Sequence, residues 1–177
     1  MQYLLKITLQ NTELWRLIAV DGIADRAFVA QLIALAFGYR NKYRAFVVGG
    51  REYSAGYGGE IKSGQEMASF DDFHLKQDGE FIYRHDTSSD ELHDVRILKA
   101  EEKLHCLMPS CLVGAGYVPP DLEIGHVSVN EYLDRDDCPS LNLREVTQRM
   151  RTFGLRRGDA HSALLNAGAA PLNFKTN

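Results

Sequence analysis

The first residues of the chain alternate between apolar and polar side chains. From Tyr3 to Leu9, apolar residues occupy every second position, with Lys6 and Thr8 between them. This spacing is typical of a strand with one buried face. Residues 14–20, LWRLIAV, predict a second, more deeply buried strand. The polar link between the two strands indicates a hairpin, so we expect them to pair antiparallel.

The pattern then changes to helical spacing. Asp25 can accept hydrogen bonds from the first N–H groups of a helix that runs to about Phe37, and Gly38 can adopt the left-handed conformation that ends it. Further apolar residues widen the apolar surface beyond a narrow stripe, so we expect this helix to pack across a sheet. The residues on its main apolar face are Phe28, Leu32, Leu35 and Tyr39.

Short apolar segments follow the helix. Gly49 and Gly50 supply the positive φ values of a tight turn between two strands. A surface loop, a helical turn that begins at Ser69 and a second hairpin come next. The predicted strands are residues 44–48, 51–55, 80–86 and 92–102, and the loop is residues 56–66.

The C-terminal third lacks strand periodicity. Residues 108–125 contain several prolines and glycines and are predicted to pack as coil. Ser128 and Glu131 form a capping box for a short helix, and Asn142 with Glu145 opens another. The apolar seam of that helix ends before Gly154, and a last short helix is predicted over residues 160–167.

The order of these elements predicts the fold class. Strands and helices do not alternate as they do in parallel sheets, so we expect an α+β protein with a mainly antiparallel sheet. Its strand-strand-helix-strand opening is β-grasp-like, and its C-terminal part is helical. We expect one α+β domain over residues 1–135 and a helical extension, residues 136–177, packed on it.

Composition places the chain among ordinary globular proteins, with 45% hydrophobic and 25% charged residues. The longest apolar run, Ala27 to Tyr39, is shorter than the roughly 20 residues that a bilayer requires. The N-terminus does not resemble a secretory signal, and three cysteines fit a reducing compartment. We therefore expect a cytoplasmic protein with free thiols that does not enter a membrane.

The charges suggest a nucleic-acid partner as one alternative. A net charge of -4 disfavours a protein that coats nucleic acid over its whole surface. Arginines nevertheless gather between Arg144 and Arg157, and Arg144, Arg149 and Arg151 are the candidate contacts to a polyanion. The other interpretation is a solvated face, or pairing with the acidic segment upstream.

Residues 81–95 concentrate histidines and acids. Asp86 and His93 lie on either side of a predicted tight turn, where residues on paired strands approach each other. An imidazole and a carboxylate in contact could form a general-base pair or a metal site, with His85 nearby. The alternative is a hairpin edge at which a buried Asp86 bonds to loop N–H groups.

A zinc site is a further hypothesis. His105, Cys106 and Cys111 offer imidazole and thiolate ligands, to which His126 or Cys138 could be added. The spacing provides no second tight pair of ligands, as structural zinc sites usually do. Cysteines that act as small buried apolar residues are the alternative, and no other cofactor is indicated.

Several motifs together resemble the plasmid pRiA4b ORF-3 family, whose members are also called insertion-sequence passenger proteins. Trp15 and Arg16 stand where that family has Ile-Trp-Arg-Arg. The segments AFGY, FVVGGREY, FIYRHD, LHDV and PSCLVGAGYVPPDLEIG follow in the family's order, over roughly residues 3 to 133. The resemblance implies a shared fold and an association with mobile genetic elements, whereas the family has no assigned reaction.

The departures from that family pattern concern its polar cluster. Asp86, His93 and Cys111 are retained, but His85 replaces a tyrosine and Glu91 replaces a tryptophan. If the cluster is a working site in the family, this chain has lost much of it. We therefore expect a non-enzymatic protein that binds a macromolecule, with a protein as the partner. The alternatives are an enzyme or metal protein that uses Asp86 and His93, and a nucleic-acid-associated protein.

Overall fold

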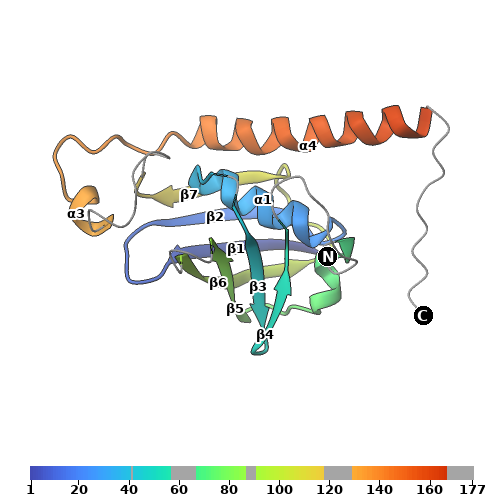
Figure 1. Ribbon diagram of the computed structural model, residues 1–177, viewed down its shortest axis with the longest axis horizontal. Coiled ribbons are helices and arrows are strands. Elements are labelled where there is room, and N and C mark those ends of the chain that lie inside the picture. Colours follow the sequence, from blue (N-terminus) through green and yellow to red (C-terminus); the bar gives the residue numbers. More distant parts are fainter. Residues whose placement is uncertain (41, 57–66, 87–90, 118–128, 167–177) are drawn as a thin grey trace.

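The computed structural model describes residues 1–40, 42–56, 67–86, 91–117 and 129–166, with side chains except those of Glu91 and residues 156–166. Within the described residues, seven strands form one sheet in the order β4-β3-β5-β6-β1-β2-β7, and all neighbours are antiparallel (Figure 1). The predicted α+β class with a mainly antiparallel sheet is confirmed. The strands are β1 (Gln2–Leu9), β2 (Trp15–Asp21), β3 (Arg44–Val48), β4 (Arg51–Ser54), β5 (Glu80–His85), β6 (Glu91–Glu101) and β7 (Ser110–Ala115).

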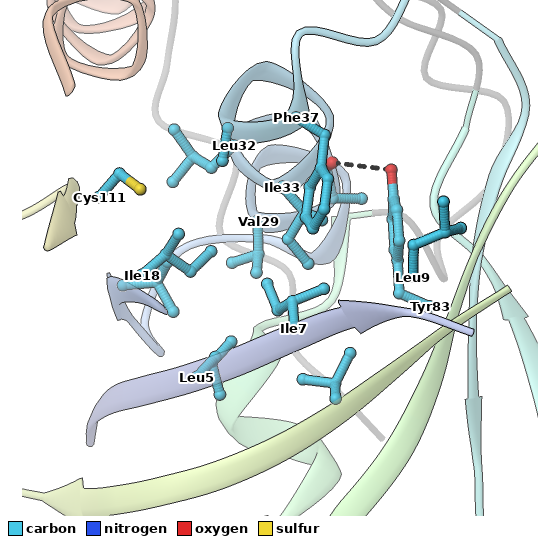
Figure 2. Packing of buried hydrophobic residues seen from close by; sticks show 14 of the residues in the cluster. Leu5, Ile7, Leu9, Ile18, Val29, Leu32, Ile33, Phe37, Tyr83 and Cys111 are labelled. Carbon is cyan, nitrogen blue, oxygen red and sulfur yellow. Dashed lines mark hydrogen bonds between the residues drawn. The ribbon is translucent and has the colours of Figure 1, made fainter. Parts of the chain in front are cut away.

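Helix α1 (Arg26–Phe37) covers the inner face of the sheet. Asp25 accepts a hydrogen bond from the Phe28 backbone N–H at 2.7 Å, and Gly38 ends the helix with φ of 77°, as predicted. Every second residue of β1 is buried in the core, and Figure 2 shows side chains of α1 packed over those of β1 and β2. The predicted helix-on-sheet core is therefore confirmed, with Leu5, Ile7, Ile18 and Ile33 fully buried.

The two predicted turns after α1 are also present. Gly49 and Gly50 connect β3 to β4 with φ values of 57° and 77°. Ser69 caps a short 3-10 helix, η1 (Phe70–Phe73), whose Phe70 is buried against Tyr3. Most of the predicted loop over residues 56–66 lies outside the described residues.

Helix α4 (Leu143–Asn166) differs from the prediction. Its start is as expected, because Asn142 Oδ1 accepts a hydrogen bond from the Glu145 N–H at 3.2 Å. The prediction of an end before Gly154 and a separate helix over residues 160–167 was wrong, since α4 continues through Gly154 as one helix. A glycine inside a helix destabilises it by only about 1 kcal/mol relative to alanine. The first turns of α4 pack on α1 and β7 (Figure 1), and this packing offsets the cost.

The prediction of coil over residues 108–125 was wrong for strand β7, Ser110–Ala115. It pairs with β2, and a register shift beside Leu17 leaves Leu112 without a partner across the pair. This bulge breaks the period of two on which strand prediction depends. Gly114 is required by packing, because a Cβ atom there would lie 2.9 Å from Arg16 Cδ. The strand forms because β2 offers it an edge, which the local sequence does not reveal.

The β-grasp-like topology, the short helix near residue 130 and the domain boundary have different outcomes. The β-grasp-like detail is not confirmed, since β5 and β6 separate β3 from β1 in the sheet. A short helix, α3 (Val129–Leu133), forms where the capping box predicted one, although Ser128 lies outside the described residues. The division at residue 135 stays a prediction. None of the described helices combines the length and the apolar character needed to cross a bilayer.

Candidate functional site

The histidines of the predicted site lie in an aromatic cluster beside the end of α1. Tyr83 on β5 is paired with His93 on β6, so both face inward, and His85 lies two residues after Tyr83 on the same face. Tyr39, just after α1, contacts both histidines: its Oη is 2.8 Å from His93 Nε2, and its ring stacks on His85 with centroids 4.6 Å apart. The turn after the helix thus joins the hairpin of β5 and β6 to α1.

Both histidines of this cluster are closed to solvent. His93 is 0% exposed and His85 is 2% exposed. Burial, together with a smaller effect of the positive charge of Arg44, lowers the pKa of His85 to about 4, and Asp86 opposes this shift. His85 is therefore neutral near pH 7, with Nδ1 3.2 Å from the Tyr83 hydroxyl.

Asp86 occupies the end of β5 in a left-handed conformation, with φ of 60°. Aspartate tolerates this region better than most residues. Its side chain is 9% exposed and forms an ion pair with Lys42, and its backbone N–H donates to the Tyr43 carbonyl at 2.9 Å. Asp86 therefore ties the end of β5 to the segment before β3. The side-chain contact is an ion pair with Lys42, whereas the structural alternative expected bonds to loop N–H groups.

Tyr39 and Tyr83 were not among the predicted site residues. The period of two that places Phe81 and Tyr83 on one face of β5 also includes His85, so the inward direction of His85 was readable from the sequence. The contact of Tyr39 with His93 could not be predicted, because it joins residues that are far apart in the sequence.

Cys111 lies far from this cluster. Three strand spacings separate β6 from β7, roughly 14 Å, and Figure 2 shows Cys111 and Tyr83 on opposite sides of the core. Burial raises the pKa of the Cys111 thiol to about 11, against the effect of Arg16. His105 is exposed and Cys106 is half-buried. Within the described residues, no three potential metal ligands come together, so His105, Cys106 and Cys111 are not gathered into one site.

The arginines of α4 have different environments. Arg144 is exposed. Arg149 lies 3.8 Å from Glu145 and faces the end of α1 near Gly38. Arg151 donates to the Ser110 hydroxyl at 2.9 Å and to the Pro109 carbonyl at 3.4 Å. Its hydrogen bonds are therefore made within the fold, which reduces the arginine surface predicted for a polyanion.

The outer face of the sheet carries an apolar surface at one end. Leu17 on β2 is paired with Val113 on β7, so the two side chains lie side by side on the face opposite α1. Val113 is 40% exposed and the neighbouring Leu112 is 41% exposed. Trp15 lies on the same face of β2 and has Lys6 Nζ 5.1 Å from its ring. We call Trp15, Leu17, Leu112 and Val113 the outer-face patch.

Comparisons with known proteins add a fold relationship. No family model matches the chain, and no curated protein matches it. A solved structure, that of the protein of unknown function MM3350 from Methanosarcina mazei Go1, is similar with a TM-score of 0.53 and 21% sequence identity. The match covers 68% of this chain and 72% of that one. The similarity extends to the fold and carries no function.

Proposed function

We propose that this chain is a non-enzymatic binding protein that holds a protein partner on the outer-face patch. The observation that carries the proposal is the exposure of Leu112 and Val113, 41% and 40%, next to half-buried Trp15 and Leu17. Contiguous exposed apolar side chains on a soluble domain mark interaction surfaces more often than chance.

The distribution of polarity on the same face supports this choice. The middle of the outer face, where β1 and β6 pair, carries the exposed charges Lys6, Asp94 and Arg96. An antiparallel sheet with one solvated face normally keeps polar side chains there. The β7 end departs from this rule, since its outward residues are apolar. A partner that covers this end would remove Leu112 and Val113 from water and leave the charged centre as a polar rim.

The histidine cluster supports a non-enzymatic role. His93 is fully buried against Tyr39, and Asp86 is paired with Lys42. A general base needs to reach the proton that it abstracts from a substrate. Both groups are instead explained by the packing of β5, β6 and α1.

Affinity purification from the source cells tests the proposal. Val113→Lys places a charge in the outer-face patch at a position that is already 40% exposed, so the fold should tolerate it. We expect a protein that is retained by the wild type to be retained about tenfold less by Val113→Lys, as for the loss of a buried apolar contact. Arg51→Glu, an exposed change on β4 at the opposite edge of the sheet, is the control and should retain the partner. Equal retention by Val113→Lys and the wild type would refute the proposal.

The resemblance to the plasmid pRiA4b ORF-3 family remains part of the proposal. It depends on the order of short motifs such as the pair Trp15-Arg16 and the segment around Cys111. A map of neighbouring genes tests it: recurrent mobile-element genes beside this one would support the assignment, and their consistent absence would argue against it. A cytoplasmic location is proposed on the same sequence grounds as before.

A further inference from the structure

A pocket of about 400 Å³ lies between α1 and α4. Small-molecule sites commonly have volumes of about 300 to 1,000 Å³. Leu35 of α1 forms one wall and α4 supplies the others, so the pocket is built on two helices rather than on loops. The lining residues are Leu35, Glu145, Gln148, Arg149, Thr152 and Phe153.

Arg149 brings a positive charge to this pocket with few partners of its own. Its Nη1 is 3.8 Å from Glu145 Oε1, longer than a hydrogen bond, and its side chain is 33% exposed. Its Nε makes no hydrogen bond to any part of the chain that the structure describes. Arg151, by contrast, bonds to Ser110 and Pro109. The Nη groups of Arg149 therefore remain able to donate to an acceptor that enters the pocket.

A second guanidinium, that of Arg16, interacts electrostatically with Arg149. Arg16 is fully buried, and it donates to backbone carbonyls, at 3.0 Å to Ala36 and at 2.8 Å to Trp15 and Ala115. Burial lowers the pKa of Arg16, and the positive charge of Arg149 adds to this effect, so the two charges influence each other.

The pairing geometry of the guanidinium favours a carboxylate with a single charge. Two guanidinium groups and one carboxylate, that of Glu145, give the region a small positive excess. Planar guanidinium groups bind carboxylates through two parallel hydrogen bonds. Arg16 already donates to backbone carbonyls, so Arg149 is the guanidinium that offers donors in this pocket, and one guanidinium pairs with one carboxylate.

The rest of the lining suits an apolar body. Leu35 and Phe153 are half-buried, and the Phe153 ring stacks on Phe28 with centroids 5.3 Å apart and planes at 17°. This contact holds the Phe153 ring in place from α1. Gln148 and Thr152 add an amide and a hydroxyl that can bond to a ligand beside the guanidinium.

We infer that this pocket binds a small organic monocarboxylate with an aromatic or branched apolar body. The carboxylate bonds to the Nη groups of Arg149, and the apolar body packs against Leu35 and Phe153. The site is separate from the outer-face patch, so this inference stands or falls independently of the proposed protein partner.

Titration of the isotopically labelled full chain with sodium benzoate, followed by amide NMR shifts, tests the inference. We expect saturable shifts at Leu35, Gln148 and Phe153. Benzyl alcohol, which has a similar shape and no charge, should bind to the wild type about tenfold more weakly than benzoate, because a charge-assisted bond is lost. For the same reason, the variant Arg149→Met should bind benzoate about tenfold more weakly than the wild type does. Arg144→Met, an exposed change on the same helix, should bind benzoate within about twofold of the wild type.

Three outcomes would overturn the inference. They are benzoate shifts that do not saturate at the pocket residues, benzyl alcohol binding as tightly as benzoate, and undiminished benzoate binding by Arg149→Met. The amide spectrum reports whether each variant is folded. If Arg149→Met does not fold, the comparison of benzoate with benzyl alcohol on the wild type decides the question alone.

Discussion

The hydroxyl of Thr147 bonds to both backbone groups of Cys111. It accepts from the Cys111 N–H at 3.1 Å and donates to the Cys111 carbonyl at 3.0 Å. Because β7 is the last strand of the sheet among the described residues, these backbone groups point away from β2 toward its edge. A side chain of α4 thus takes the place of a neighbouring strand at this position, and it protects an edge that could otherwise pair with another chain.

Thr147→Val should destabilise the protein without changing its shape. Valine has nearly the same volume but cannot bond to Cys111, so we expect the free energy of unfolding to fall by about 1 to 3 kcal/mol. Urea denaturation measures the change. Thr152→Val, an exposed change on the same helix, should alter stability by no more than about 0.5 kcal/mol. Equal effects of the two substitutions would show that the Thr147 bonds contribute nothing specific.

Gly154→Ala should stabilise the protein. In a continuous α4, a Cβ atom at this position would lie 3.7 Å from Phe28 Cζ, which is an ordinary contact. Replacing a helical glycine with alanine then raises the free energy of unfolding by about 0.5 to 1 kcal/mol. A loss of stability in urea denaturation would instead indicate that α4 ends at this glycine.

Gly114→Ala is the contrasting substitution. A Cβ atom there would lie 2.7 Å from the Trp15 carbonyl oxygen and 2.9 Å from Arg16 Cδ. Such overpacking typically costs about 1 to 3 kcal/mol, and the same urea measurement should show it. If Gly114→Ala were as stable as the wild type, the close approach of β7 to β2 at Arg16 would be refuted.

The protein should become less stable as the pH decreases, because of His85. Its pKa is about 4 in the folded protein against 6.5 for the ordinary side chain, so the unfolded chain binds the proton first as the pH drops. The free energy of unfolding therefore decreases as the pH drops below about 6.5, and the loss reaches about 2 kcal/mol by pH 5. Below about pH 4 the contribution of His85 no longer changes.

The variant His85→Phe isolates this contribution. Phenylalanine keeps the stack on Tyr39 and does not titrate, and Tyr83 can still donate to the Ala30 carbonyl, 3.2 Å away. Urea denaturation between pH 7.5 and pH 5 should give a shallower dependence on pH for His85→Phe than for the wild type. His105→Gln, at an exposed position, should leave the dependence unchanged. The same steepness in all three proteins would contradict the assignment to His85.

The three cysteines should react at different rates. Cys111 is 5% exposed and its thiol has a pKa of about 11, so about one molecule in a thousand carries the thiolate at pH 8. Cys106 and Cys138 are half-buried. Peptide mapping after brief treatment with iodoacetamide should find them modified and Cys111 intact. In urea all three should react alike, and rapid native modification of Cys111 would contradict its placement in the core.

The candidate site was only partly accessible from the sequence. The pattern of residues 81–95 correctly predicted the antiparallel pairing of β5 with β6, but Asp86 forms an ion pair with Lys42 where bonds to loop N–H groups were expected. The partners of His93 were not predictable, since Tyr39 reaches it only after α1 has packed on the sheet. The pocket beside Arg149 was missed for a similar reason, because its walls come from two helices that are far apart in the sequence.

The sequence by itself determined the elements whose signals are local: the first hairpin, the caps of α1 at Asp25 and Gly38, and the glycine turn before β4. Alternation, capping and positive φ are properties of a few adjacent residues, so they can be recognised before folding. Only the tertiary structure decided that β7 is a strand and that α4 continues past Gly154. A strand of irregular period forms when a neighbouring strand supplies hydrogen bonds. A glycine stays helical when packing outweighs its preference for a turn. Both conditions depend on other parts of the chain, so the segment alone does not reveal them.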